Sequence, residues 1–250
     1  MAESFGTDVE RYDRARPAYP HELVDRIIEA SPGTDVLDVG CGTGIEARQF
    51  RDAGCRVLGI DPDARMAEFA RGSGIDVEVA KFEDWQPKGR TFDAVIAGQA
   101  WHWVDPATGP AKAASVLRPG GLLAVFAHVF QPPAPVAEAL ATACRRVIPG
   151  APFAGESRPA AEVYDVMFTG FAESIARADV LGAPDRWSFE WEQTYTREQW
   201  LDFLPTTGGL THLPPSELAE VLSEVGAAID DLGGSFVLPY TTLAVVAARA

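Results

Sequence analysis

The chain has 250 residues, of which 47% are hydrophobic, and its formal net charge at pH 7 is −15. This length and composition are typical of one α/β domain with a substantial core and room for an inserted cap. The negative charge argues against a large nucleic-acid partner, because such binding depends mainly on Lys and Arg, although it does not exclude a local basic patch.

No apolar run reaches the roughly 18 residues that a membrane span requires, and the N-terminal segment does not show a basic region followed by an apolar one. We therefore expect a cytoplasmic protein with no membrane partner. The three cysteines, Cys41, Cys55 and Cys144, are an odd number without metal-ligand spacing. They indicate neither a disulfide framework nor a zinc site, so no metal is expected.

The first distinctive segment, Tyr12 to Pro20, is rich in Tyr and Arg. It precedes a predicted helix whose apolar face runs from Leu23 to Ile28 and which ends at Ser31-Pro32-Gly33. Taken alone, such a segment is typical of an N-terminal arm that packs on the protein surface.

The segment from Val36 to Gly44 is a short apolar run that breaks into three alternating glycines, and an amphipathic segment, Ile45 to Ala53, follows it. This pattern predicts a buried strand, a tight turn and a helix. Glycine is required where the backbone takes a positive φ or where a ligand lies against the main chain. A second apolar run, Arg56 to Asp61, ends in a carboxylate about 20 residues after the first glycine, the spacing at which an acid meets ribose hydroxyls.

The glycine spacing is Gly-x-Gly-x-Gly, whereas a dinucleotide fingerprint needs its third glycine at position 45, which is Ile. An NAD-dependent reductase is therefore a distant alternative. The run instead resembles the class I S-adenosylmethionine-dependent methyltransferases, in which an acid-x-Gly-x-Gly-x-Gly loop holds the methionine part of the cofactor and the next acid binds its ribose. The resemblance implies a Rossmann-like α/β fold with a doubly wound, seven-stranded, mostly parallel sheet. It assigns to cofactor binding Asp38, Gly40, Cys41, Gly42, Gly44 and Asp61.

The N-terminal arm acquires a second interpretation from the same resemblance. Arms with the pattern Tyr-x-x-x-Arg-Pro-x-Tyr-Pro fold over the bound cofactor in small-molecule members of the family. Tyr12 and Arg16, together with Tyr19, are therefore candidate contacts of a lid arm over residues 1–20.

The adenosine side of the expected site follows Asp61. Pro62 is expected as the first residue of a helix capped by Asp61, and it lies beside the cofactor. Met66 on that helix either fills the core or, as the resemblance implies, contacts the adenine. After a predicted strand over residues 76–80, Lys81 stands where the family often has an aspartate, so the adenine contacts would pass to Glu83 and the Phe82 backbone amide.

A fourth strand, residues 92–97, leads into Gly98-Gln99-Ala100-Trp101-His102-Trp103. Ligands of open α/β sheets bind beyond the carboxyl ends of strands, so this aromatic stretch is expected at the site. By resemblance Gln99 is a cofactor contact. His102 is the first candidate for a general base, and His128, after a fifth strand over residues 122–127, is the second. Either histidine could instead be a structural hydrogen-bonding residue.

The composition changes to a Pro-rich segment over residues 131–184, which is expected to be a capping insertion over the active site of a single domain, residues 1–250. Thr196 and Gln199 form a capping-box signature, and residues 216–229 are predicted to be helical. Further strands are expected over residues 189–195 and 242–248. Aromatic side chains of this half are candidates for the pocket or for the core, namely Phe153, Tyr164, Phe168, Phe171, Trp187 and Trp191.

The sequence thus predicts an S-adenosylmethionine-dependent methyltransferase that acts on a small-molecule acceptor, whose oxygen, nitrogen or carbon receives the methyl group. A macromolecular methyltransferase acting on a protein or tRNA, and a non-methylating S-adenosylmethionine-binding protein, are the alternatives. The oligomeric state, monomer or homodimer, stays open.

Overall fold

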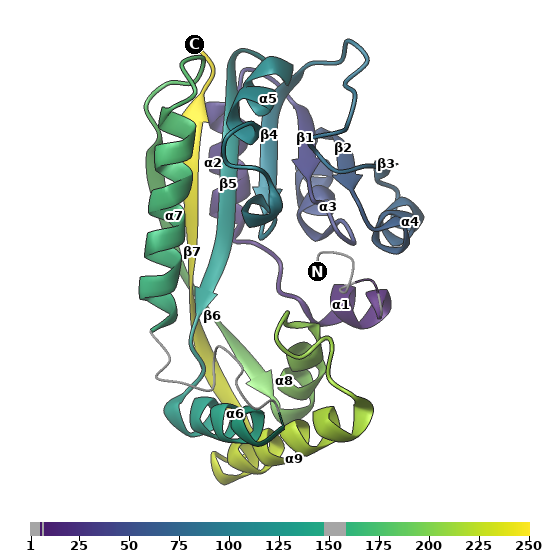
Figure 1. Ribbon diagram of the computed structural model, residues 1–250, viewed down its shortest axis with the longest axis vertical. Helices are drawn as coiled ribbons and strands as arrows, with labels where there is room; N and C mark the ends of the chain where they lie inside the picture. Colours follow the sequence, from purple (N-terminus) through teal and green to yellow (C-terminus); the bar gives the residue numbers. More distant parts are fainter. Residues whose placement is uncertain (1–5, 7, 148–158) are drawn as a thin grey trace.

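The computed structural model describes residues 6, 8–147 and 159–250. In these residues the chain forms a seven-stranded sheet with the order β3-β2-β1-β4-β5-β7-β6 (Figure 1). The strands are β1 (Asp35–Val39), β2 (Arg56–Asp61), β3 (Asp76–Val79), β4 (Phe92–Gly98), β5 (Leu117–Phe130), β6 (Asp185–Thr196) and β7 (Ser235–Ala248). The first five strands are parallel, and β7 is antiparallel to both β5 and β6. This confirms the predicted mostly parallel, doubly wound sheet.

Helices cover both faces of the sheet. They are α1 (Val9–Ala15), α2 (His21–Ala30), α3 (Ile45–Asp52), α4 (Ala64–Gly72), α5 (Gly109–Val116), α6 (Ala134–Val147), α7 (Ala160–Ala176), α8 (Arg197–Phe203) and α9 (Pro215–Asp231), with short 3-10 turns η2 (Trp101–Trp103) and η4 (Leu204–Thr206). Neighbouring residues of β1 point to opposite faces, so Val36 enters a core with α2 and Leu37 enters a second core with α5 and α7. Burial on both faces explains why these strands read as continuous apolar runs.

The starts of two helices can be compared with the sequence. The capping box at the start of α8 is confirmed: the Thr196 hydroxyl accepts from the Gln199 amide, and the Gln199 side chain accepts from the Thr196 amide. The prediction for α4 was wrong, because its N-cap is Asp63, whose carboxylate accepts from the Arg65 amide. Asp61 and Pro62 precede the helix, and the Asp61 carboxylate accepts from the Asp63 amide and from the Gly42 amide of the glycine loop instead.

Three strands are longer than predicted because they run beyond the parallel sheet. β5, β6 and β7 have 14, 12 and 14 residues, against five in β1. Their extensions, with α6, α8, η4 and α9, enclose a third core rich in aromatic rings, including Tyr195, Trp200 and Tyr240. We name this part the aromatic lobe; it forms the lower end of the molecule in Figure 1.

The segment expected to be a capping insertion, residues 131–184, is divided between two places. Helix α6 belongs to the aromatic lobe, whereas α7 lies along the sheet, where Phe168 and Ile175 enter its core. Residues 148–158, with Phe153, lie outside the described residues. The aromatic lobe beyond the sheet is therefore built from α6 of this segment together with α8 and α9, which come from a later part of the chain.

No helix among the described residues is long and apolar enough to cross a membrane. In the same part of the chain, no three His, Cys, Asp or Glu side chains lie close enough together to hold a metal ion. Cys41, Cys55 and Cys144 are buried and free.

Candidate functional site

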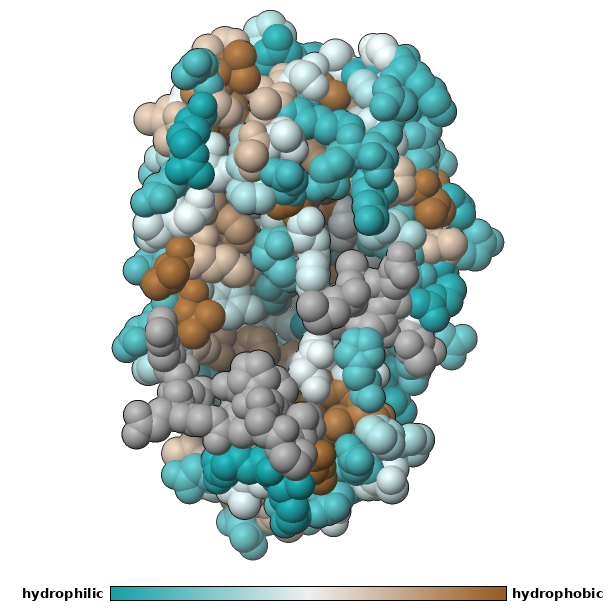
Figure 2. Space-filling model, viewed as in Figure 1, coloured by the Kyte–Doolittle hydropathy of each residue, from teal (hydrophilic) through white to brown (hydrophobic). Residues whose placement is uncertain are grey.

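The loops that follow β1 and β4 lie at the carboxyl ends of neighbouring parallel strands, where the strand order reverses. This is the position at which open α/β sheets bind ligands. Two adjoining cavities open here, a narrow pocket of about 40 Å³ and a broad cavity of about 1020 Å³, and both are lined by Gly40, Gly42, Gly98 and Gln99. On the face drawn in Figure 2, the surface is hollowed at mid-height, between the sheet and the aromatic lobe.

The structure brings most of the predicted site residues together. The broad cavity is lined by Tyr12, Arg16, Gly40, Gly42, Asp61, Pro62, Met66, Phe82, Glu83, Gln99 and His102. Cys41 and His128 line only the narrow pocket. Asp38 and Gly44 line neither: Asp38 is fully buried, and Gly44 is the left-handed N-cap of α3.

The glycine loop needs glycine for its backbone conformation. Gly42 has a φ of +54°, and a Cβ on it would meet no atom within 4 Å. Its open side therefore faces the space in which a ligand would lie against the main chain. Gly40 anchors the loop to β2, because its amide donates to the Ile60 carbonyl at 2.8 Å.

Asp61, the predicted ribose acid, also holds the loop in shape. One carboxylate oxygen accepts from the Gly42 amide at 2.9 Å, and the other accepts from the Asp63 amide at 2.8 Å. Burial raises the pKa of Asp61, and the two amide hydrogen bonds oppose that shift. Each oxygen keeps a further lone pair for a ligand hydroxyl.

The arm connects the sheet to the aromatic lobe across the site. Arg16 donates to the Thr206 hydroxyl at 3.0 Å and lies 5.0 Å from the Tyr12 ring and 5.2 Å from the Phe203 ring. On the sheet side, Asp13 pairs with Arg48 at 2.7 Å. Helix α1 is further attached to α8 through Asp202, which pairs with Arg11 and Arg14. The arm therefore forms one wall of both cavities.

The expected adenosine side is formed by the start of α4 and the segment after β3. Met66 and Phe82 are buried next to the broad cavity. Glu83 accepts from the Asp105 amide at 2.8 Å, which ties this segment to the aromatic stretch after β4. Lys81 also lines the cavity.

The aromatic stretch after β4 begins with a strained residue. Gln99 has a φ of +54°, which is uncommon outside glycine, and its amide donates to the Phe126 carbonyl at 2.9 Å. His102 follows in η2 with its ring 4.7 Å from that of Trp103. The His102 side chain is open to the broad cavity, yet the surrounding protein lowers its pKa by desolvation. It is therefore neutral at neutral pH and can accept a proton.

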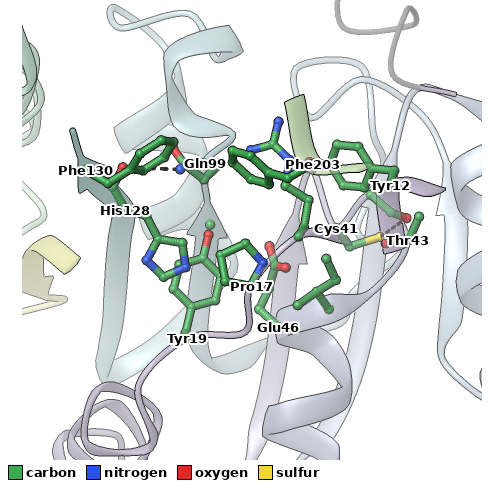
Figure 3. A pocket seen from close by; sticks show the side chains of 15 residues that line it. Tyr12, Pro17, Tyr19, Cys41, Thr43, Glu46, Gln99, His128, Phe130 and Phe203 are labelled. Atoms are coloured by element: carbon green, nitrogen blue, oxygen red, sulfur yellow. Dashed lines mark hydrogen bonds between the residues drawn. The ribbon is translucent and has the colours of Figure 1, made fainter. Parts of the chain in front are cut away.

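His128 has a different environment (Figure 3). Its ring is stacked on Tyr19 at 4.3 Å, and its Nδ1 lies 2.9 Å from the Thr242 hydroxyl, which also accepts from the indole N–H of Trp191. Burial lowers the pKa of His128 to about 3. A group with this pKa is a weak proton acceptor at neutral pH, so the surroundings favour a structural role.

Sequence reasoning missed one acid in the site, Glu46. It lies in the first turn of α3, is only 6% exposed and lines the narrow pocket. Burial raises the pKa of Glu46 to about 8. A signal was present in the sequence, since Glu46 lies next to Ala47 and four residues before Phe50, on the apolar face of its helix.

The chain is similar to known methyltransferases over part of its length. Residues 37–125 match the model of a methyltransferase domain family. An uncharacterised methyltransferase of Mycobacterium tuberculosis (strain H37Rv) is 40% identical over 126 residues, which cover 49% of this chain and 51% of that protein. A ubiquinone biosynthesis O-methyltransferase of Methylocella silvestris is 37% identical over 98 residues, or 36% of this chain and 38% of that protein.

A solved structure of a proposed type II methyltransferase from Anaeromyxobacter dehalogenans shares the fold. It has a TM-score of 0.60 and 22% identity, with 92% of this chain and 97% of that chain covered. The family match over residues 37–125 and the shared fold both indicate a Rossmann-like methyltransferase domain. Over this part, the chain is similar to proteins named as methyltransferases. It spans about half the length of the first curated relatives that it matches, of which 51% is covered.

Proposed function

We propose that the protein transfers a methyl group from S-adenosylmethionine to a small-molecule acceptor. The observation that carries this proposal is the composition of the broad cavity: the Gly42 and Asp61 side of the cofactor loop shares one space with His102 and Trp103. Cofactor and acceptor can therefore meet there, and holding two reactants in line supplies about 7–11 kcal/mol of a barrier.

The residues present fit an adenosyl amino acid. Among the described residues, neither carboxylate oxygen of Asp38 has a hydrogen-bond partner, although the side chain is fully buried. A buried acid without a partner suits a site that takes a cationic ligand group. Asp61 would bind the ribose hydroxyls, while Met66, Phe82 and Glu83 would hold the adenine. Arg16 suits the carboxylate end.

When bound, the cofactor supplies an electrophilic methyl group on a positively charged sulfur. The chain would position the acceptor and take its proton. His102 is our candidate base, because it is neutral and faces the cavity. A positioned base typically contributes about 10²–10⁴-fold. If the acceptor is already an anion, His102 would only orient it.

A small acceptor is favoured by the walls of the cavity. The space is bounded by the sheet, the arm, α7 and the aromatic lobe, through residues such as Tyr164, Phe130 and Thr207. The Methylocella relative is named as an O-methyltransferase of ubiquinone biosynthesis, so phenolic acceptors are the first to test. We also propose a cytoplasmic location, no nucleic-acid partner, and a monomer or homodimer.

The proposal is tested in two stages. Titration calorimetry with S-adenosylmethionine and S-adenosylhomocysteine, with NADH as control, should show micromolar binding of the adenosyl ligands alone. Transfer of a labelled methyl group is then followed with a panel of phenols, amines and carboxylates. Label in the solvent extract supports a small acceptor, whereas label in protein or RNA favours a macromolecular one. Product without consumption of the methyl donor would point to a non-methylating enzyme.

A further inference from the structure

Glu46 lies where a ligand would reach the floor of the narrow pocket. Figure 3 shows its carboxylate beside Pro17, between the side chains of Tyr19 and Cys41. A Cβ on Gly98, at the end of β4, would lie 2.7 Å from both a Glu46 carboxylate oxygen and the Tyr19 hydroxyl. The missing side chain at Gly98 therefore lets both groups approach the strand end.

A second buried acid, Asp38, comes from the neighbouring strand β1. Asp38 is fully buried at the end of β1, and its two carboxylate oxygens have no partner in the part of the chain that the structure describes. Burial raises the pKa of both Tyr19 and Cys41, which line the narrow pocket, and the charges of Glu46 and Asp38 add to the shift. Burial raises the pKa of Asp38 well above its ordinary value, and the charge of Glu46 adds to that shift, so the two buried acids lie within electrostatic reach of each other and we treat them as a pair.

The charged groups around this pair leave it short of positive charge. Burial raises the pKa of Glu46 despite opposing contributions from its own amide, the Gly98 amide and the Arg48 charge, and the Asp61 charge adds to the rise. Arg48 itself is held by Asp13 and the Thr43 carbonyl. Arg16 from the arm is held by Thr206. The remaining titratable neighbours are neutral: Tyr12 and Tyr19 from the arm, and His128 on β5. Two buried carboxyls in this setting share a proton unless a cation replaces it.

We propose that Glu46 binds the cationic α-ammonium group of the cofactor's methionine moiety, and that this contact couples cofactor binding to the release of a proton from the Glu46–Asp38 pair. The inference rests on the proposed function and adds a specificity residue to it. Burial raises the pKa of Glu46 to about 8 in the empty protein, so a proton is present at neutral pH to be released. An ammonium ion beside the pair stabilises its ionised form, and affinity therefore rises with pH.

The test compares two ligands on the full chain by titration calorimetry. S-Adenosylhomocysteine carries the α-ammonium group, and 5′-methylthioadenosine lacks the amino-acid end. Titrations between about pH 6 and 7 keep most of the α-amino group protonated, since its usual pKa is about 7.7–8.0. In the wild type, the preference for S-adenosylhomocysteine should grow as the pH rises. Repetition at pH 7 in two buffers of different ionisation enthalpy should show proton release with S-adenosylhomocysteine only.

Glu46→Gln should weaken S-adenosylhomocysteine about ten- to hundredfold, the range expected for one hydrogen bond to a charged group, and leave 5′-methylthioadenosine unaffected. It should also reduce the proton release. Glu68→Gln is the matched control, because Glu68 is an exposed acid on α4 that pairs with Arg71, and it should change neither ligand. A third ligand, S-adenosylhomocysteine with hydrogen in place of the amino group, distinguishes the contribution of the ammonium group to binding from that of the carboxylate.

Three results would overturn the inference. Glu46→Gln could weaken both ligands equally, which would make Glu46 a support of the loop. It could also leave S-adenosylhomocysteine binding unchanged. If the variant does not fold, the wild type alone is used. An equal pH dependence of its affinity for the complete and the deaminated ligand would contradict the contact between Glu46 and the α-ammonium group. A wild type that binds neither adenosyl ligand would instead refute the proposed function itself.

Discussion

The carboxylate of Asp61 accepts a hydrogen bond of 2.9 Å from the backbone amide of Gly42. The end of β2 therefore fixes the glycine loop that follows β1. Because the same carboxylate faces the broad cavity, one side chain both shapes the loop and presents an acceptor to the ligand. Two different substitutions at Asp61 are therefore needed to distinguish its contact with the loop from its contact with the ligand.

Asp61→Ala should weaken S-adenosylhomocysteine about a hundredfold or more, because it removes the ribose acceptor and leaves two amides unpaired, each worth about 1–3 kcal/mol when buried. Asp61→Asn keeps one carbonyl acceptor, so its affinity for S-adenosylhomocysteine should fall only about tenfold. Titration calorimetry measures both affinities. If Asp61→Ala binds as the wild type does, the ribose assignment is wrong.

Gly42→Ala should abolish cofactor binding at a modest cost in stability. In the empty protein a Cβ at Gly42 meets no atom, so the cost is the left-handed backbone, about 1–2 kcal/mol for a non-glycine residue. Gly120→Ala is the matched control, because Gly120 also has a positive φ, +75°, and open space, but belongs to β5 and lines neither cavity. Urea unfolding should show a similar loss in the free energy of unfolding for both variants. Titration calorimetry should show weaker binding of S-adenosylhomocysteine for Gly42→Ala only. Equal binding by both would mean that no ligand approaches Gly42.

His102→Ala should lower turnover on the true acceptor by about 10²–10⁴-fold while cofactor affinity stays close to that of the wild type. The reason is that the His102 ring contributes a proton acceptor to the cavity and is not needed to hold the adenosyl group. Steady-state kinetics and calorimetry give the two quantities. His21→Ala, at an exposed position of α2, is the control. Full turnover by His102→Ala would reduce His102 to a structural residue.

His128 should make the folded state sensitive to mild acid. Its folded pKa of about 3 lies below the ordinary value of 6.5, so the unfolded chain binds a proton between these values and the folded chain does not. The stability that His128 contributes is therefore lost as the pH falls below about 6.5, by up to about 1.4 kcal/mol per pH unit.

The substitution His128→Gln removes this titration and keeps a polar group for the Thr242 hydroxyl. Urea unfolding at pH 7.5, 6.5 and 5.5 should give a flatter pH dependence for the variant. Only the slopes of the free energy of unfolding against pH are compared, because the substitution also alters the stacking on Tyr19. Parallel curves for the variant and the wild type would show that the pKa of His128 in the folded state is close to its ordinary value.

Local rules predicted the part of the fold that lies closest in sequence to the glycine loop. The apolar runs of β1, β2 and β4 were found with nearly correct ends, because burial on both faces leaves an uninterrupted apolar signal. β5, β6 and β7 were predicted too short, since their outer ends pack against α6, α8 and α9, far away in sequence. The prediction of Asp61 as a helix cap is wrong because the rule for caps considers only neighbouring residues, whereas the Asp61 carboxylate accepts from the Gly42 amide of another loop.

The amino-acid sequence by itself determined the glycine loop after β1 and the aromatic stretch after β4, because each is a contiguous pattern with its own backbone requirement. Only the tertiary structure decided the states of the ionisable groups. Glu46, Asp38 and His128 come from three different elements, and their pKa values depend on what buries them. His128 becomes a poor base because Tyr19 and Thr242 enclose it, and Glu46 becomes a candidate ligand because Gly98 leaves it space. Desolvation depends on the atoms that surround a group in space, and these come from distant parts of the chain.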